Sequence, residues 1–201
     1  MRKQVVVIHG GNTYDSYDEY LTNLKSTEIN LERMQAKKWK ESLHDRLGEG
    51  FEVIKPSMPN GENAKYIEWK IWFDKLVPLL QNNLILIGHS LGGIFIAKYL
   101  SENRFLKNIS STILLAAPFD DKDSDYSLAD FELPKNLDLF SEQCQKISVY
   151  HSKDDPVVPF NDSLKYLKAI PRAQAVLFEN KKHFNQPEFP ELIENIKTLD
   201  N

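Results

Sequence analysis

Residues 84–93 read Leu-Ile-Leu-Ile-Gly-His-Ser-Leu-Gly-Gly. The four apolar residues at 84–87 form a short run that suits a strand buried on both faces of a sheet. The next five residues fit Gly-x-Ser-x-Gly with Ser90 at the centre, and apolar residues then recur at helical spacing from Leu91 to Leu100. A strand, a serine and a helix in this order predict a nucleophile elbow, a sharp turn that exposes the serine hydroxyl at the end of a sheet.

The bare five-residue pattern has a competing explanation, because it arises by chance in roughly one chain in fifteen of this length. Chance matches rarely lie between a buried strand and an amphipathic helix, so we favour the nucleophile. Glycines at 88 and 92 also fit a turn with no room for side chains. The free N–H groups at the start of the following helix suit a developing oxyanion.

The composition bounds the class of protein. The chain has 201 residues, of which 41% are hydrophobic and 27% charged, as in a soluble globular protein. This length suits one domain, so we expect residues 1–201 to form a single domain. The formal net charge of −4 gives no reason to expect nucleic acid or an anionic membrane as partner. The oligomeric state is left open.

Cysteine usage and the first residues point to a compartment. Cys144 is the only cysteine in the sequence, which excludes an internal disulfide and a cysteine-based zinc cluster. The apolar run at 5–8 ends in His-Gly-Gly-Asn and is too short for the core of a signal peptide. No apolar run reaches the length of a membrane span. We expect a cytoplasmic protein that needs no metal and no organic cofactor.

Short apolar runs alternate with helical patterns along the chain. The predicted strands are residues 5–8, 51–54, 84–87, 112–117, 147–151 and 175–178. This alternation predicts a three-layer α/β/α sandwich with a mostly parallel six-stranded sheet. We expect all three tryptophans to pack against the sheet rather than to form a binding patch. The positions expected to face the core include Trp72, Leu79 and Leu164.

Residues 13–35 have no place in this alternation and form a predicted insertion. They mix tyrosines, charges and spaced leucines without glycine or proline, and Tyr17, Tyr20 and Leu24 keep a helical spacing. Two interpretations stay open. In one, the segment is a lid or substrate wall whose apolar side chains, Met34 included, pack over the mouth of the site and limit it to small acyl groups. In the other, the segment is a helix that only extends the surface.

A serine hydroxyl becomes a good nucleophile only when a base takes its proton and a third group orients the base. In enzymes with a serine elbow, the chain order is serine, acid, histidine. Of the five histidines, only His183 follows both the serine and a plausible acid, and it lies just after the last predicted strand. His9 is expected to pin a loop, His44 to lie on the surface, and His89 to point away from the hydroxyl.

The acid is expected in the loop that follows residues 147–151. This loop offers Asp154 and Asp155, and two adjacent side chains cannot both point at one imidazole. Either Asp155 orients His183, or Asp154 does so while Asp155 caps the turn.

The chain resembles the α/β-hydrolase superfamily, and within it the small serine hydrolases of the retinoblastoma-binding protein nine family. The resemblance rests on His-Gly-Gly at 9–11, the elbow at 88–93, the stretch 154–159 and His-Phe-Asn at 183–185. It covers most of the chain except residues 13–35. Lys182 departs from the family, whose members often have glycine there. The Leu-x-Cys-x-Glu motif that binds retinoblastoma protein is absent.

The resemblance implies a set of roles. The ending Asp-x-x-Val-Pro recurs in α/β-hydrolases after the fifth strand, which favours Asp155 over Asp154. The oxyanion donors would be the backbone N–H groups of Gly11 and Leu91.

The expected function is therefore that of a serine hydrolase that cleaves a small carboxylic ester through an acyl-enzyme on Ser90. His183 would move the proton and Asp155 would orient it. An amidase or peptidase with the same three residues is one alternative. A non-catalytic protein-binding module on a hydrolase scaffold is another, because a fold alone does not fix a function.

Overall fold

The computed structural model describes residues 2–122 and 124–199. Its centre is a six-stranded sheet in the order β2-β1-β3-β4-β5-β6, and every neighbouring pair of strands is parallel. The strands are Lys3–Ile8 (β1), Phe51–Ile54 (β2), Leu84–His89 (β3), Ile109–Leu115 (β4), Cys144–Ser152 (β5) and Gln174–Phe178 (β6). The predicted six-stranded parallel sheet is confirmed.

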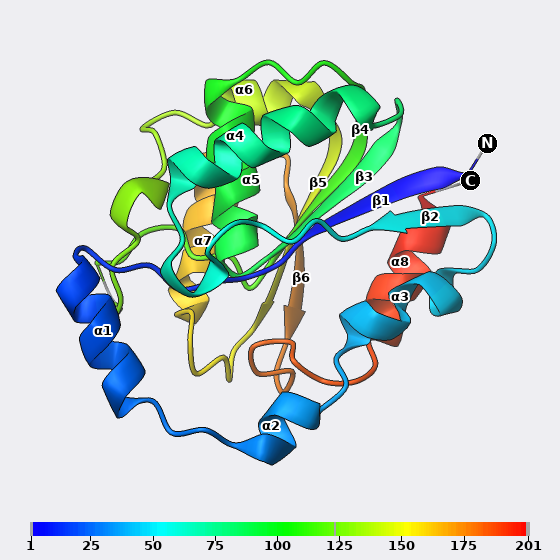
Figure 1. Cartoon of the computed structure of the whole chain (residues 1–201). Helices are drawn as coiled ribbons and strands as arrows, with labels where there is room; N and C mark the ends of the chain where they lie inside the picture. Colours follow the sequence, from blue (N-terminus) through cyan, green and yellow to red (C-terminus); the bar gives the residue numbers. More distant parts are fainter. Residues whose placement is uncertain (1, 123, 200–201) are drawn as a thin grey trace.

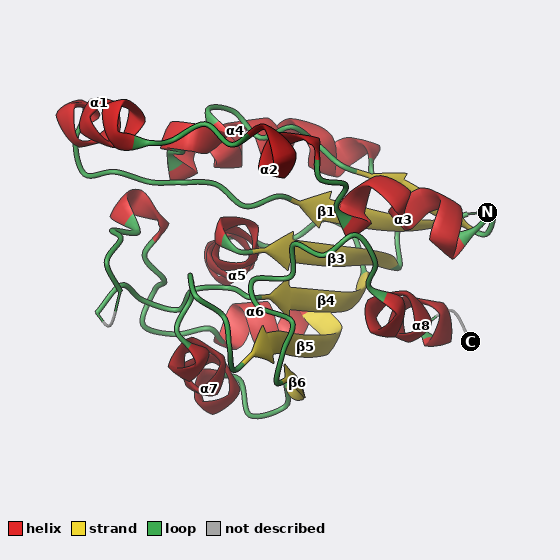
Figure 2. Cartoon of the chain, turned by 90° about the horizontal axis from the view of Figure 1, so that it is seen from below, coloured by secondary structure: helices red, strands yellow, loops and turns green. Residues whose placement is uncertain are grey.

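Most of the helices cover the two faces of this sheet (Figures 1 and 2). The helices are Tyr17–Ser26 (α1), Leu31–Gln35 (α2), Trp39–Leu47 (α3), Tyr66–Leu76 (α4), Leu91–Glu102 (α5), Asp138–Gln143 (α6), Phe160–Ala169 (α7) and Pro190–Thr198 (α8). Short 3-10 turns cover Gly61–Asn63 (η1), Val77–Leu79 (η2) and Ala129–Phe131 (η3). None of the helices in the described ranges has both the length and the hydrophobicity needed to cross a bilayer.

The core consists of two hydrophobic clusters, one on each face of the sheet. Val6 and Ile8 of β1 pack in the cluster that contains α4, α5, α6 and α7, whereas Val5 and Val7 pack in the cluster that contains α3 and α8. Successive side chains of a strand point to opposite faces, so a strand covered on both sides must be apolar throughout. This explains the continuous apolar runs in the sequence and gives the three layers that they predict.

Three side chains that were expected in the core are exposed. Trp39 and Trp69 are buried, but Trp72 is 47% exposed, because α4 buries the stripe that contains Tyr66, Trp69 and Phe73 instead. Leu79 is 76% exposed, since the chain leaves α4 before Pro78 and continues as η2.

Leu164 is 46% exposed because α7 turns a polar face inward. Asp162 of α7 accepts a hydrogen bond from Phe119 N (2.9 Å), and Tyr166 donates to the carbonyl of Pro118 (2.8 Å). Hydrogen bonds to the chain after β4 therefore fix the rotation of this helix, and periodicity alone does not reveal them.

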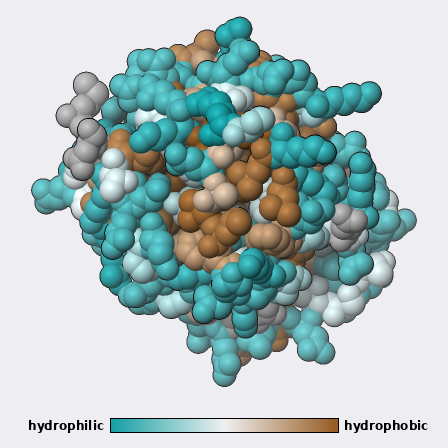
Figure 3. All heavy atoms as spheres, turned by 180° about the vertical axis from the view of Figure 1, so that it is seen from behind, coloured by the Kyte–Doolittle hydropathy of each residue, from teal (hydrophilic) through white to brown (hydrophobic). Residues whose placement is uncertain are grey.

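The predicted insertion forms α1 and α2, which lie outside the sheet and its layers (Figure 1). The expected helical spacing is present, and Ser16 caps α1 through a capping box with Glu19. The expected burial is not present, because α1 contains no buried residue and Met34 of α2 is 73% exposed. Seen from the reverse side of the molecule, the surface is mostly hydrophilic, with scattered hydrophobic areas of which the broadest lies near its centre (Figure 3).

Candidate active site

The turn between β3 and α5 holds Ser90 in a strained conformation. Ser90 has φ 56° and ψ −126°, a region that residues other than glycine rarely adopt. Its N–H donates to the carbonyl of Leu115 (2.8 Å), which fixes the turn against β4. A Cβ on Gly88 would lie 2.3 Å from Gly92 O, and one on Gly92 would lie 2.4 Å from Ile8 O. The predicted strand, serine and helix are therefore present, and close backbone contacts explain both glycines.

The loop after β1 lies against this serine. A Cβ on Gly10 would come within 3.0 Å of Ser90 Cβ, and one on Gly11 within 2.5 Å of Gly61 O. Gly11, Ser90 and Leu91 line the same pocket. Leu91 is the first residue of α5, where a backbone N–H has no partner within the helix. The two candidate oxyanion donors thus lie beside the candidate nucleophile.

His9 holds this loop in place, as expected. Its Nε2 accepts a hydrogen bond from Met58 N (2.8 Å), and its Nδ1 lies 2.6 Å from Gly10 O. Since Nε2 is an acceptor, the proton resides on Nδ1 and points at that carbonyl. His44 is exposed, also as expected.

Asp155 and His183 form a buried pair. His183 Nδ1 donates to Asp155 Oδ2 (2.9 Å), with Oδ1 at 3.1 Å, and the aspartate side chain is fully buried. Because the proton on Nδ1 faces the carboxylate, Nε2 of His183 carries a free lone pair and is able to accept a proton. Asp155 Oδ1 also accepts from the N–H groups of Val157 (2.8 Å) and Val158 (3.1 Å). Asp155 therefore both caps the turn and contacts His183.

Asp154 has a different environment. Its side chain is exposed, and its Oδ1 accepts from Ser152 Oγ (2.6 Å) and from the N–H of Lys182 (2.9 Å). These two hydrogen bonds hold the pKa of Asp154 below its usual value. Asp154 thus ties the loop before His183 to the end of β5, and it does not contact the imidazole.

Ser90 and His183 are not hydrogen-bonded to each other among the residues that the structure describes. Catalytic hydrogen bonds are often long before substrate binds, and they shorten in the reactive complex. The structure therefore joins the acid to the base directly and leaves the base apart from the nucleophile.

His151 lies behind the pair. Its Nε2 is 3.0 Å from Val158 O and 3.8 Å from Asp155 Oδ2, and the side chain is buried. Burial lowers the pKa of His151, so the ring is neutral near pH 7. It supports the loop that contains Asp155, a role that no sequence pattern indicated.

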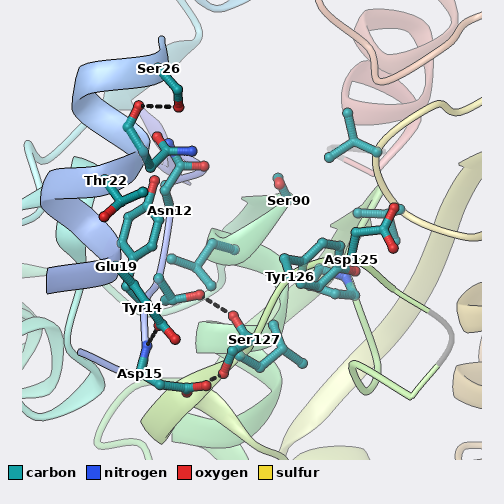
Figure 4. A pocket seen from close by; sticks show the side chains of 18 of the residues that line it. Asn12, Tyr14, Asp15, Glu19, Thr22, Ser26, Ser90, Asp125, Tyr126 and Ser127 are labelled. Atoms are coloured by element: carbon teal, nitrogen blue, oxygen red, sulfur yellow. Dashed lines mark hydrogen bonds between the residues drawn. The ribbon is translucent and has the colours of Figure 1, made fainter. Parts of the chain in front are cut away.

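Ser90 opens into a pocket of about 770 Å³ (Figure 4). On one side stands α1, with Glu19, Thr22 and Ser26, and on the other lies the loop that contains Asp125 and Tyr126. Burial raises the pKa of Tyr126 to about 12, so its hydroxyl keeps its proton at neutral pH.

Two hydrogen bonds join the walls of this pocket. Thr13 Oγ1 donates to the carbonyl of Ser127 (2.5 Å), and Ser127 Oγ donates to Asp15 Oδ1 (2.5 Å). The insertion therefore forms a wall of the pocket rather than a surface helix alone. That wall is polar, and the pocket exceeds the volume of a short acyl chain, so the expected narrowing to small acyl groups is not observed.

No group of three or more His, Cys, Asp or Glu side chains is arranged to hold a metal ion within residues 2–122 and 124–199.

A family model described as serine hydrolase matches residues 31–198. The chain therefore belongs to the serine hydrolase family. The match begins after α1, so β1 and most of the insertion lie outside it. No curated protein matches the chain in sequence.

Solved structures share the whole fold at low sequence identity. The ydeN gene product of B. subtilis is 21% identical, with a TM-score of 0.79 and 98% of each chain covered. A lipase-esterase related protein of Clostridium acetobutylicum is 14% identical, with a TM-score of 0.64 over 98% of this chain and 94% of that one. Est1E of Butyrivibrio proteoclasticus, solved with ferulic acid bound, is 14% identical, with a TM-score of 0.63 over 98% and 88%. The chain thus has the α/β-hydrolase fold.

Proposed function

We propose that this serine hydrolase cleaves a carboxylic ester through an acyl-enzyme on Ser90. The observation that carries the proposal is the buried Asp155–His183 pair, whose hydrogen bond leaves Nε2 free as a base at the same sheet edge as the strained serine. This arrangement is the one that an acyl transfer requires: a nucleophile, a base and a group that orients the base.

The first half-reaction forms the acyl-enzyme. Ser90 Oγ attacks the carbonyl carbon while His183 Nε2 takes the hydroxyl proton, and the carboxylate of Asp155 stabilises the imidazolium. The N–H groups of Gly11 and Leu91 bind the oxyanion. The tetrahedral intermediate then expels the alcohol, which takes the proton from His183. In the second half-reaction His183 takes a proton from water, the resulting hydroxide attacks the acyl group, and Ser90 leaves with the proton.

The volume and lining of the pocket indicate the size and polarity of the substrate. A volume of about 770 Å³ accommodates more than an acetyl or butyryl group, and α1 contributes carboxylate, hydroxyl and amide side chains to its lining. We therefore infer a substrate whose acyl or alcohol part is larger than a short alkyl chain and has polar groups that face α1.

Two broader inferences accompany this function. The sheet and both hydrophobic clusters draw on residues from β1 to α8, which supports a single domain over residues 1–201. Within the superfamily, the motifs at 9–11, 88–93, 154–159 and 183–185 support membership of the retinoblastoma-binding protein nine group.

An amidase or peptidase would use the same groups, so the test must compare leaving groups. We would label the wild type and Ser90→Ala with a fluorophosphonate probe, and assay p-nitrophenyl esters of increasing acyl length beside the matched p-nitroanilides. We expect labelling and ester hydrolysis in the wild type alone. Faster turnover of the anilides would favour the amidase, and a folded wild type with neither activity nor labelling would favour the binding module. A folded Ser90→Ala protein with wild-type activity would overturn the mechanism.

A further inference from the structure

The loop that contains His183 has a strained backbone. Lys182 has φ 48° and Phe184 has φ 51°, so both neighbours of the histidine lie in the left-handed region that favours glycine. Such a conformation persists only where the surrounding structure holds it. The hydrogen bonds that hold this loop therefore bear on where the imidazole lies.

Three N–H donors from outside the loop bind its carbonyl oxygens. The indole Nε1 of Trp39 donates to Phe184 O (2.9 Å), and the backbone N–H of Trp39 donates to Gln186 O (2.9 Å). His89 Nε2 lies 2.9 Å from His183 O. A carbonyl oxygen only accepts, so the proton of His89 is on Nε2. The start of α3 and the residue before Ser90 thus hold the loop together.

Lys40 completes this arrangement. Its Nζ lies 2.6 Å from His89 Nδ1. Burial, with the charge of Lys40 adding to it, lowers the pKa of His89 well below its usual value, so the ring is neutral. With its single proton on Nε2, Nδ1 has only a lone pair, and Lys40 must donate. The contacts form a chain from Lys40 Nζ through the His89 ring to the carbonyl of His183.

Lys40 has no carboxylate counter-ion in the part of the chain that the structure describes. The charged or titratable groups that face the pair are His183, Lys38 and Lys55, and Lys55 Nζ donates to the carbonyl of Lys40 (2.9 Å). Burial, assisted by the charge of Lys38, lowers the pKa of Lys40 to about 7. Burying a lysine ammonium group without a carboxylate partner costs desolvation free energy. The hydrogen bond to His89 compensates part of that cost.

We propose that Lys40 and His89 are positioning residues: Lys40 orients the His89 ring, whose Nε2–H fixes the His183 carbonyl and thereby the distance from the His183 imidazole to Ser90. This inference rests on the proposed function. The centroids of the two imidazole rings lie 5.0 Å apart, so the rings are neighbours and the position of the His89 ring bears on that of the His183 ring. Displacing a catalytic group by about 1 Å costs up to about a hundredfold in rate.

The test compares Lys40→Met with Lys37→Met, which removes an exposed lysine three residues earlier. With p-nitrophenyl acetate we expect Lys40→Met to lower kcat by about tenfold at pH 6 with KM unchanged. The deficit should shrink above pH 7, because the wild-type ammonium loses its proton there and a neutral amine is a weaker donor. Lys37→Met should match the wild type at every pH.

A double-mutant cycle tests whether Lys40 acts through His89. In a His89→Leu background, Lys40→Met should add no further loss, because the link is already broken. Should His89→Leu fail to fold, the pH profile of Lys40→Met decides instead. A kcat for Lys40→Met equal to that of Lys37→Met, a deficit that does not change with pH, or losses that add in the cycle would each overturn the proposal.

An independent readout separates this inference from the proposed function. The imidazole NMR signals of His183 should shift in Lys40→Met and stay unchanged in Lys37→Met, whether or not the protein hydrolyses the ester. A wild type inactive on all esters would overturn the proposed function alone. Unchanged His183 signals in Lys40→Met would overturn the positioning role alone.

Discussion

Replacing Asp155 by asparagine tests the proposed mechanism at its most constrained hydrogen bond. The Oδ1 of the asparagine can still accept from the N–H groups of Val157 and Val158, so the turn should survive. The amide NH₂ would then take the place of Oδ2, which now lies 2.9 Å from His183 Nδ1. Two donors cannot face each other, so the imidazole would shift its proton to Nε2 and lose its basic lone pair.

The expected loss follows from that change of tautomer. An asparagine at the acid position of a serine triad lowers kcat by roughly 10⁴-fold, which corresponds to about 5.4 kcal/mol in the activation free energy. Asp154→Asn is the matched control, because the exposed Asp154 keeps an oxygen that accepts from Ser152 and Lys182. Its kcat should stay within about threefold of the wild type, since exposed charges contribute little.

The assay is the steady-state hydrolysis of a p-nitrophenyl ester at pH 8, with thermal unfolding of each variant to confirm the fold. A folded Asp155→Asn enzyme that keeps more than a tenth of wild-type kcat would refute the assigned role of Asp155. Equal losses from both asparagines would refute it as well, because they would place the orienting acid elsewhere.

Other predictions concern the strained or crowded backbone positions, the effect of Lys40 protonation on stability, and the insertion. Gly92→Ala should lower the free energy of unfolding by about 1–3 kcal/mol or more in a denaturant titration, because its Cβ would lie 2.4 Å from Ile8 O. Lys182→Gly should raise that free energy by about 0.5–1 kcal/mol, because it relieves a φ of 48°. Lys40 has a folded pKa of about 7 against an ordinary value of 10.5, so the unfolded chain binds more protons between these pH values. Wild-type Tm should therefore rise relative to that of Lys40→Met as pH increases through this window. Replacing residues 17–35 by a short linker should leave the protein folded, because α1 buries nothing, and should change the acyl-length profile. An unchanged profile would exclude α1 as a substrate wall.

The fold was predictable because its inner strands contain apolar runs that are covered on both faces. Val5, Val6, Val7 and Ile8 alternate between the two core clusters, so no polar residue interrupts the run. The predicted helix faces were less accurate where a polar contact outweighs the apolar stripe. The hydrogen bond from Tyr166 to Pro118 turns α7 so that Leu164 points outward, and it joins residues 48 apart in sequence.

The candidate site was predictable where chain order and local motif carry the chemistry. Ser90, Asp155 and His183 each follow a strand of a parallel sheet, and the carboxyl ends of such strands lie along one edge. The proposed role of Lys40 was not predictable, because its partner His89 is 49 residues away and a lysine at the start of a helix is usually exposed. Long-range side-chain pairs of this kind leave no periodic signal in one sequence.

The two oxygens of Asp155 have different sets of partners, and this limits how the carboxylate can move. Oδ1 accepts from two backbone N–H groups and lies 3.1 Å from His183 Nδ1, while Oδ2 lies nearer to that nitrogen, at 2.9 Å. The carboxylate therefore cannot rotate about its Cβ–Cγ bond when a positive charge forms on His183. In the proposed mechanism the imidazolium meets a carboxylate that is already oriented, so proton transfer from Ser90 carries little reorganisation energy on the acid side of the ring.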